Sequence, residues 1–399
     1  MGEGGDGVMA KLGEICTFQS GGTPSKSNAE YFGGNIPWVS TTALNGNIIK
    51  GSDAVAWITP KAIQESAAKI VPANSIMVGT RVGIGKVAVN SVEMSTSQDV
   101  ISLIGIDESR WYKPYLCKVL LSKKDWLSSQ ARGATIKGIK IDTVANIEIP
   151  EVGYAEQKKI AAVLDKVSDL IFLRKQQLVK LDELVKARFV EMFGDSVANT
   201  KNFPSTTLET VMTVFPQNGL YKPQTEYVQD DTGIPILRID AFYNGKVTNW
   251  NTLKRLICSG TEIDRYLLRE NDIVINRVNS IEYLGKCAHI VGLKEKTVFE
   301  SNMMRFHIDE KKVNAVYVTE VLCTEDIYRQ ILRRAKKSVN QASINQEDVK
   351  SLEILVPPLS LQNQFAAFVE RVDQQKQTIQ QSLEKLELMK KALMQEYFG

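Results

Sequence analysis

The chain reads Leu178-Val179-Lys180-Leu181-Asp182-Glu183-Leu184-Val185-Lys186-Ala187-Arg188-Phe189-Val190-Glu191-Met192-Phe193-Gly194 in its middle and Leu383-Glu384-Lys385-Leu386-Glu387-Leu388-Met389-Lys390-Lys391-Ala392-Leu393-Met394-Gln395-Glu396-Tyr397-Phe398-Gly399 at its end. The two stretches match without a gap at an offset of 205 residues, and the correspondence extends back to Gln157 and Gln362. Repetition at a fixed offset indicates a duplicated structural unit. The 399 residues are therefore predicted to form two copies of one unit, related by a pseudo-two-fold axis.

Each copy of the repeated stretch has the apolar spacing of a coiled coil, with steps that alternate between four and three residues. Polar residues interrupt this spacing at different places in the two copies, so each falls opposite an apolar position of the other copy. We therefore predict two long helices, at 151–195 and 356–399, that pair with each other as an antiparallel coiled coil. The alternative is that each is an ordinary amphipathic helix packed on its own domain. The predicted seam consists of Ile160, Leu164, Val167, Ile171, Leu178 and Leu181 in the first copy and Phe365, Val369, Val372, Ile379, Leu383 and Leu386 in the second.

The regions before the two long helices match more loosely and have the pattern of α+β domains. Ile36-Pro37-Trp38-Val39-Ser40 parallels Ile234-Pro235-Ile236-Leu237-Arg238. Short β-branched runs such as Val100–Ile104 are separated by Gly, Pro and Asn, which is typical of strands and turns. A helical stretch near 111–129 has a counterpart near 313–336. We predict two mixed α/β domains, the first head at 11–150 and the second head at 196–355, after a disordered leader at 1–10.

The composition is typical of a globular protein with reduced thiols. Hydrophobic residues make up 43% and charged residues 24% of the chain, and the net charge of +3 permits an anionic partner without requiring one. The five cysteines are scattered and include no Cys-x-x-Cys pair. No apolar run approaches the length of a membrane span, and no signal peptide is recognisable. We therefore expect a cytoplasmic protein with no membrane partner.

Several phrases of the sequence, together with the duplicated plan, resemble one known family. Gly21-Gly22-Thr23-Pro24-Ser25 and Gly79-Thr80-Arg81-Val82-Gly83-Ile84-Gly85-Lys86 are similar to parts of a first target-recognition domain. Ile147-Glu148-Ile149-Pro150 with Glu156-Gln157-Lys158-Lys159-Ile160 is similar to the start of a conserved helical region, and Ile354–Leu359 with Gln362–Phe365 repeats it. From about residue 11 to 399 the chain thus resembles the specificity subunit of Type I restriction–modification enzymes.

The resemblance implies a non-catalytic subunit that recognises double-stranded DNA. Two target-recognition domains would bind a bipartite, asymmetric target, while the paired helices set the gap and dock the partner subunits. The implied partners are two modification subunits, which methylate adenine with S-adenosylmethionine, and restriction subunits, which cleave DNA with ATP and Mg²⁺. No cofactor is therefore expected in this chain itself. The alternative is a coiled-coil adaptor that binds proteins without recognising a DNA sequence.

The opening loop of the second head departs from the pattern of the first. Gln217-Asn218-Gly219-Leu220-Tyr221-Lys222-Pro223 stands where the first head has its Gly-Gly-Thr-Pro-Ser phrase. Such a difference is expected if the two heads read different sequences.

The glycine-rich loops are the first candidates for DNA contacts. In the first head this loop carries Arg81 and Lys86, and in the second the matching loop carries Arg277, Asn279 and Lys286. Arginine can pair with guanine and asparagine with adenine through two hydrogen bonds. We therefore interpret Arg81, Arg277 and Asn279 as base contacts; the alternative is an exposed loop with solvated charges.

Basic clusters just before each long helix are candidates for phosphate contacts. The first cluster contains Arg132, Lys137 and Lys140, and the second contains Arg333, Arg334, Lys336 and Lys337. Thr135 and Ser338 add a hydroxyl to each. Phosphate neutralisation provides most of the affinity for DNA. We favour a phosphate clamp over a solvated helix end.

Alternating residues on two predicted strands form the last candidate surface. Trp38, Ser40 and Thr42 alternate along one strand, and Arg238 lies on the matching strand of the second head. One face of each strand could meet DNA, although Trp38 is equally compatible with a core position.

Motifs for catalysis or metal binding are not recognisable in the sequence. Gly83-Ile84-Gly85-Lys86 lacks the spacing of a phosphate-binding loop, and no Gly-x-Gly-x-x-Gly cofactor loop follows a strand. Cys287 and His289 could share a metal, but a zinc site needs two more ligands at a suitable spacing. We therefore expect no metal site and predict these two side chains to be buried and inert.

Overall fold

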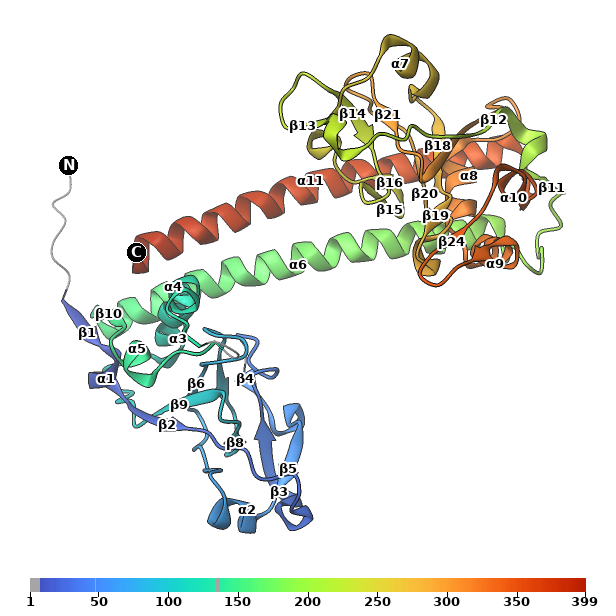
Figure 1. The fold of residues 1–399 in the computed structure, drawn as a ribbon. Coiled ribbons are helices and arrows are strands. Elements are labelled where there is room, and N and C mark those ends of the chain that lie inside the picture. Colours follow the sequence, from blue (N-terminus) through green and yellow to red (C-terminus); the bar gives the residue numbers. More distant parts are fainter. Residues whose placement is uncertain (1–7, 47, 134–136) are drawn as a thin grey trace, which may run out of the picture. The chain divides into compact units, whose positions relative to one another are not determined.

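The computed structural model describes residues 8–46, 48–133 and 137–399 (Figure 1). The chain divides into two compact units. Unit 1 comprises the chain up to Gln176 together with Gln380–Gly399, and unit 2 is Gln177–Ile379. Each unit therefore contains one head and a segment of each long helix.

The two long helices are α6 (Tyr154–Phe193) and α11 (Leu359–Phe398). In unit 1 the start of α6 packs with the end of α11, because Leu164 and Phe398 share one core. In unit 2 the end of α6 packs with the start of α11, because Val185 and Phe365 share another core. Opposite ends thus meet in both units, which confirms the predicted antiparallel pairing.

The predicted apolar seam faces inward on both helices. All twelve seam residues are buried or half-buried, whereas neighbours such as Phe172 and Leu388 are exposed. Ion pairs flank the seam within each unit: Nζ of Lys175 lies 2.8 Å from Oε1 of Glu387 in unit 1, and Lys376 bonds Asp182 in unit 2. Apolar burial and flanking charges are the features by which coiled-coil helices associate.

The described residues of the first head form two main sheets and five short α-helices. A five-stranded sheet has the order β2-β9-β6-β7-β4 and a three-stranded sheet the order β5-β3-β8, while β1 pairs with β10. The strands are β1 (Met9–Lys11), β2 (Thr17–Ser20), β3 (Phe32–Val39), β4 (Ile48–Ile49), β5 (Ala56–Ile58), β6 (Ile76–Gly79), β7 (Val87–Asn90), β8 (Ser95–Thr96), β9 (Val100–Ile104) and β10 (Glu148–Pro150). The helices are α1 (Leu12–Ile15), α2 (Pro60–Glu65), α3 (Lys113–Ser122), α4 (Lys124–Ser129) and α5 (Ile141–Ala145).

The second head repeats this plan with additions. Its sheets have the orders β12-β22-β18-β20-β16-β15, β13-β17-β14-β21 and β19-β24-β23, and β11 pairs with β25. The strands are β11 (Ser205–Thr207), β12 (Met212–Asn218), β13 (Tyr227–Val228), β14 (Ile234–Leu237), β15 (Phe242–Tyr243), β16 (Gly245–Val247), β17 (Lys254–Leu256), β18 (Asp272–Asn276), β19 (Val278–Asn279), β20 (Cys287–His289), β21 (Val298–Phe299), β22 (Met303–Ile308), β23 (Lys336–Lys337), β24 (Ala342–Ser343) and β25 (Glu353–Leu355). The helices are α7 (Gly260–Tyr266), α8 (Ala315–Leu322), α9 (Glu325–Arg334) and α10 (Gln346–Lys350).

Equivalent side chains attach each head to the long helices. Gln157 on α6 is buried and accepts a hydrogen bond from Tyr112 N at 2.8 Å; Gln362 on α11 is buried and accepts one from Asn314 N at 2.9 Å. A buried polar group is stable only when its hydrogen bonds are satisfied, so these contacts fix where each head joins its helix. Their repetition at the same offset as the helices supports the predicted duplication of one structural unit.

Aromatic contacts also repeat in the two units, and in each unit a tyrosine of the head meets the end of the long helix that begins on the other head. In unit 1 the ring of Tyr115 meets that of Phe398, at the end of α11, with centroids 5.5 Å apart. In unit 2 the ring of Tyr317 meets that of Phe193, at the end of α6, at 4.7 Å. Each long helix therefore begins on one head and ends in the core of the other unit.

Two local predictions need correction. Met9 and Ala10, which the sequence predicts as part of the leader, lie in β1, where they pair with Pro150 and Ile149. Met1–Gly7 lie outside the described residues. The helical stretch predicted to reach residue 336 ends at Arg334, because the chain turns there into the short strand β23.

Candidate nucleic-acid interface

The glycine-rich loops are closed by the same backbone hydrogen bonds in both heads. The loop after β6 is closed by a hydrogen bond of 2.9 Å from Gly79 N to Lys86 O, and the loop after β18 by one of 2.8 Å from Asn276 N to Lys286 O. Gly85 and Gly285 have positive φ values of 73° and 76°, a conformation that favours glycine. The two loops thus begin and end at equivalent positions, as the sequence predicted, although the second is longer and contains β19.

The lysines of these loops, which we predict as DNA contacts, lie within reach of backbone carbonyls of the protein. Nζ of Lys286 donates to Ile239 O at 2.8 Å and lies 3.6 Å from the ring centroid of Tyr243. Burial lowers its pKa. Nζ of Lys86 is 3.5 Å from Thr41 O, the equivalent carbonyl of the first head. Both lysines therefore connect the loop to a neighbouring strand end, a role that is invisible in the sequence.

The loop and the basic cluster, which we predicted as separate features, are joined in each head. Ile139 N donates to Thr80 O at 2.8 Å, and Ile344 N donates to Arg277 O at 2.9 Å. In the second head the connection becomes a sheet, β19-β24-β23, that contains Asn279, Lys336 and Lys337. One small surface thus combines a candidate base reader with two exposed lysines.

The hydrogen bonds also show which residues of the two loops are equivalent: Arg277 matches Thr80, not Arg81. The backbone N–H of Thr80 donates to Asp99 O, between β8 and β9, at 2.8 Å. The backbone N–H of Arg277 donates to Asn302 O, between β21 and β22, at the same distance, so the two residues occupy equivalent positions. Nη1 of Arg277 donates to Ser301 O at 3.1 Å. Arg277 is thus half-buried and partly engaged, whereas the Arg81 side chain is 48% exposed. Of the two, Arg81 is the more available for an external contact.

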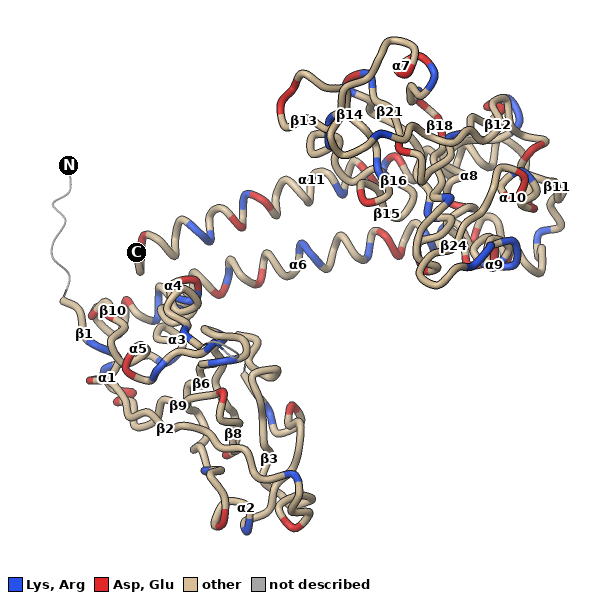
Figure 2. Tube along the Cα trace, viewed as in Figure 1, with Lys and Arg blue, Asp and Glu red and all other residues tan. Residues whose placement is uncertain are grey.

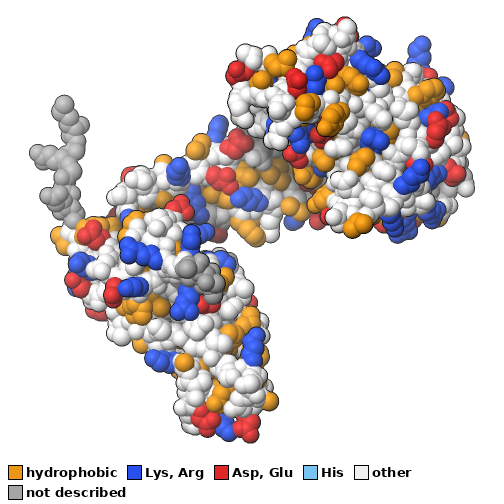
Figure 3. All heavy atoms as spheres, viewed as in Figure 1, with side chains coloured by type: hydrophobic (Ala, Val, Ile, Leu, Met, Phe, Trp, Pro, Cys, Tyr) orange, Lys and Arg blue, Asp and Glu red, His pale blue; other side chains and the backbone are white. Residues whose placement is uncertain are grey.

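The basic residues around α9 have unequal availability. Figure 2 shows Lys and Arg along this part of unit 2, and Figure 3 shows blue side chains gathered on its surface. Arg333, Lys336 and Lys337 are exposed. Arg334 instead donates to Ser351 O and Oγ, both at 3.0 Å, and to a carbonyl of its own helix. The guanidinium of Arg334 therefore stabilises the junction with α10, and the predicted clamp is reduced to the other three residues.

The described residues of the corresponding cluster in the first head contain one isolated antiparallel β-bridge. Arg132 and Gly138 exchange backbone hydrogen bonds of 3.0 Å in both directions. The side chains of Arg132, Lys137 and Lys140 are exposed. Thr135, which we predicted to add a hydroxyl here, lies outside the described residues. Three exposed positive charges thus lie at the place where the second head has Lys336 and Lys337.

The predicted alternation of Trp38, Ser40 and Thr42 along a strand is wrong. Strand β3 ends at Val39, and the next residues form a turn in which Ser40 Oγ and Thr42 Oγ1 lie 2.8 Å apart. Trp38 packs against an apolar cluster, and its indole N–H donates to Gly22 O at 2.9 Å. The alternative interpretation of Trp38 as a core residue is therefore favoured.

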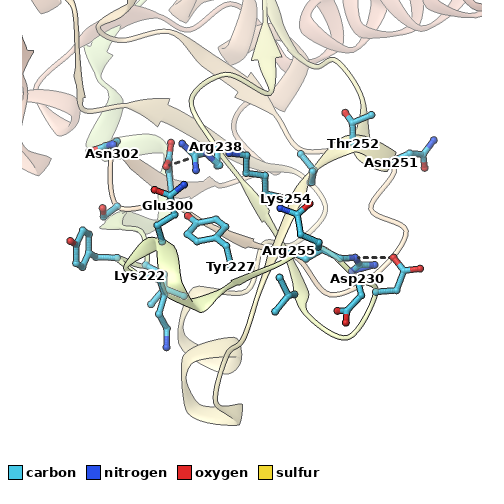
Figure 4. Close-up of a pocket in the computed structure, with 18 residues that line it drawn as sticks. Lys222, Tyr227, Asp230, Arg238, Asn251, Thr252, Lys254, Arg255, Glu300 and Asn302 are labelled. Atoms are coloured by element: carbon cyan, nitrogen blue, oxygen red, sulfur yellow. Dashed lines mark ion pairs between the residues drawn. The ribbon is translucent and has the colours of Figure 1, made fainter.

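Arg238 lies just beyond β14 and lines an open cleft of about 860 Å³ in the second head (Figure 4). Nε of Arg238 is 3.7 Å from Oε2 of Glu300, and its guanidinium carbon is 5.7 Å from the ring centroid of Tyr227. Burial raises the pKa of Glu300, although a hydrogen bond from Ile239 N and the charge of Arg238 oppose the rise. Asn302 and Lys254 also line the cleft.

Sequence reasoning found Arg238 but missed Tyr227, Glu300, Asn302 and Lys254. Glu300 follows β21, far along the chain from β14, and no local pattern connects the two. The two residues are brought together by the parallel pairing of Leu237 with Phe299, which is visible in the folded sheet and not in the sequence.

The described residues give no indication of a metal site or a membrane span. In residues 8–46, 48–133 and 137–399, no group of three His, Cys, Asp or Glu is placed to hold a metal ion. Sγ of buried Cys287 lies 3.6 Å from Sγ of Cys323, and Nε2 of His289 lies 3.0 Å from Oδ1 of Asn271. None of the helices in the described part of the chain is long and apolar enough to cross a membrane.

Comparison with known proteins agrees with the duplicated fold. The chain matches the family model described as Type I restriction modification DNA specificity domain at residues 6–183 and again at 203–388. The MjaIX specificity subunit of Methanocaldococcus jannaschii is 24% identical over 394 residues, which span 92% of this chain and 86% of the relative. The EcoKI specificity subunit of Escherichia coli is 24% identical over 388 residues, which span 92% and 81%.

Solved structures share the fold. The S subunit of the Type I restriction–modification system from M. genitalium aligns with a TM-score of 0.61 at 14% identity and covers 100% of this chain and 98% of that one. A chain from a structural study of complex assembly in a type I system aligns with a TM-score of 0.60 at 16% identity, covering 99% and 98%. With two family domains in one chain, this protein belongs to the Type I restriction–modification DNA specificity family.

Proposed function

We propose that this specificity subunit recognises a bipartite, asymmetric DNA target, with one half-site bound by each head. The observation that carries the proposal is that the heads share one backbone frame but differ in the side chains at its equivalent loop positions. Ser40, for example, stands where the second head has Arg238. Sequence is read by side chains that reach base edges, so unlike side chains on a common frame are suited to unlike half-sites.

The small surfaces around the basic clusters are the proposed phosphate contacts. They comprise Arg132, Lys137 and Lys140 in the first head and Arg333, Lys336 and Lys337 in the second, all exposed. When exposed lysines and arginines neutralise phosphates, the DNA releases its bound counterions. This release provides affinity for DNA that is independent of the base sequence. Asn279 lies in the same sheet as two of them, so base and phosphate contacts can be made side by side.

The remaining parts of the system are proposed to lie on other subunits. Two modification subunits would bring S-adenosylmethionine, and restriction subunits would bring ATP and Mg²⁺, so this chain would carry no catalytic step in the cytoplasm. Exposed apolar side chains on α6 and α11, including Phe172, Leu173 and Leu388, are suited to protein docking. The helices would also set the spacer between the half-sites.

The same exposed apolar residues favour a second candidate, a coiled-coil adaptor that binds proteins alone. Nuclease footprinting separates the two. The subunit, purified with its modification subunits, is incubated with duplexes selected from a random pool. Two protected elements with an unprotected or unspecified spacer support DNA recognition. Failure to retard any duplex at low salt supports the adaptor, and one contiguous protected element contradicts the bipartite arrangement.

A further inference from the structure

Each head holds one arginine beside a carboxylate from the same connection. This connection joins β8 to β9 in the first head and β21 to β22 in the second. Nη1 of Arg81 is 3.8 Å from Oδ1 of Asp99, and Nε of Arg238 is 3.7 Å from Oε2 of Glu300. These distances exceed the roughly 2.7–3.2 Å of a well-formed N–H···O hydrogen bond. The carboxylates therefore orient the guanidinium groups without saturating them.

The two arginines are not at equivalent positions of the frame. Backbone hydrogen bonds from Ser97 N to Val39 O, at 2.9 Å, and from Glu300 N to Leu237 O, at 3.1 Å, align the two connections. In this alignment the equivalent residues of the first and second heads are Ser40 and Arg238, Ser97 and Glu300, Asp99 and Asn302, and Arg81 and Val278. The connection thus supplies a carboxylate in both heads, but the arginine that it orients comes from a different strand end.

Arg255, at the other end of the same cleft, provides a contrast (Figure 4). Its Nη1 and Nη2 donate to the two carboxylate oxygens of Glu295 at 3.1 and 2.7 Å, and Nη1 also donates to Gly233 O at 3.0 Å. Both outer nitrogens of Arg255 are thus engaged. The carboxylates nearest Arg238, on Glu300 and Asp240, approach its Nε instead, at 3.7 and 3.9 Å. Neither carboxylate engages the outer edge of Arg238, which would make a two-bond contact with a base.

We propose that Arg238 and Arg81 each select one guanine, in the second and first half-site respectively, and that Glu300 and Asp99 position them. The inference rests on the proposed function. A guanidinium offers two parallel N–H donors that match O6 and N7 of guanine in the major groove. Stacking over Tyr227 and the hold of Glu300 reduce the number of orientations open to Arg238. Because the two arginines start from different strand ends, the guanine falls at a different place in each half-site.

A randomised duplex library tests the assignment. The complex of this chain with its modification subunits is incubated with the library and S-adenosylmethionine, and the methylated adenines are mapped by sequencing. R238A and R238K should each lower the preference for guanine at one position of one half-site by about ten-fold, while the other half-site stays intact. R81A should produce the reverse pattern. E300Q should weaken the preference at the same position as R238A, since Arg238 is retained but loses the charge that orients it.

The controls separate base reading from other roles. R255Q removes an arginine from the same cleft and should leave the methylated motif unchanged. Retention of one complete half-site in R238A shows that the variant is folded. An unchanged motif in R238A overturns the inference. So does a loss of methylation that is uniform across sequences and is restored in R238K, because that result is expected for a phosphate contact. If the wild-type complex shows no sequence preference, the proposed function fails with it; if the wild type is bipartite and R238A is unchanged, only the inference fails.

Discussion

The two heads have the same frame but differ where the frame ends. Their central sheets have equivalent orders, and the buried Gln157 and Gln362 attach them to the helices in the same way. At the loop ends, by contrast, Ser40 and Ser97 in the first head stand where the second has Arg238 and Glu300. The strands and their attachment to the helices are constrained by packing and hydrogen bonds, whereas the connections beyond the strand ends can differ between the heads. The difference indicates which positions hold the frame and which distinguish the half-sites.

The largest expected effect tests whether the helix ends belong to the two cores. Phe398→Ala should destabilise unit 1 and Phe193→Ala unit 2, each by about 3–5 kcal/mol, because each substitution leaves a cavity beside a tyrosine ring. Hydrogen exchange measured peptide by peptide would locate the loss of protection. Phe172→Ala, at a 59% exposed site, serves as the control. Loss of protection in the opposite unit in either variant would show that the helix ends were assigned incorrectly.

A smaller effect distinguishes the heads by pH. His289 on β20 has its pKa lowered from 6.5 to about 4, mainly by burial, and the equivalent residue of the first head is Val89. Between pH 6.5 and 4 the unfolded chain binds a proton that the folded second head excludes. The contribution of His289 to the free energy of unfolding is therefore fully present above pH 6.5. It is lost as the pH decreases towards 4, by up to about 3 kcal/mol.

Urea unfolding followed at several pH values checks this prediction. His289→Gln should flatten the decline between pH 6.5 and 4 for unit 2 and leave unit 1 unaffected. Equal acid sensitivity in the variant and the wild type would show that other groups cause the decline.

The smallest effect concerns the phosphate surface of the second head. Changing Lys336 and Lys337 together to Ala should weaken DNA binding about ten-fold at physiological salt and reduce the slope of log K against log salt by about 2. The loss should be the same for all sequences, because phosphates carry no base information. Lys296 and Lys311, exposed in the same head but outside the sheet β19-β24-β23, form a control pair of equal charge. A loss confined to one sequence would make Lys336 and Lys337 base readers instead.

Much of the frame was predictable because its signals are local or repeated. The heptad spacing and the 205-residue offset predicted α6, α11 and their pairing, and the run Val100–Ile104 coincides with β9. The candidate site was less accessible, because its geometry depends on long-range contacts. The bond from Ile139 N to Thr80 O joins segments that the sequence presents separately. The direction of the Lys286 side chain, toward a backbone carbonyl, depends on the position of a neighbouring strand.

The most direct test of two unlike readers on one frame is the mapping of methylated adenines in DNA from cells that contain this subunit and its modification partners. Two different specified elements, separated by an unspecified spacer of fixed length, are the predicted result. A single uninterrupted motif, or two identical elements in inverted orientation, would contradict the account.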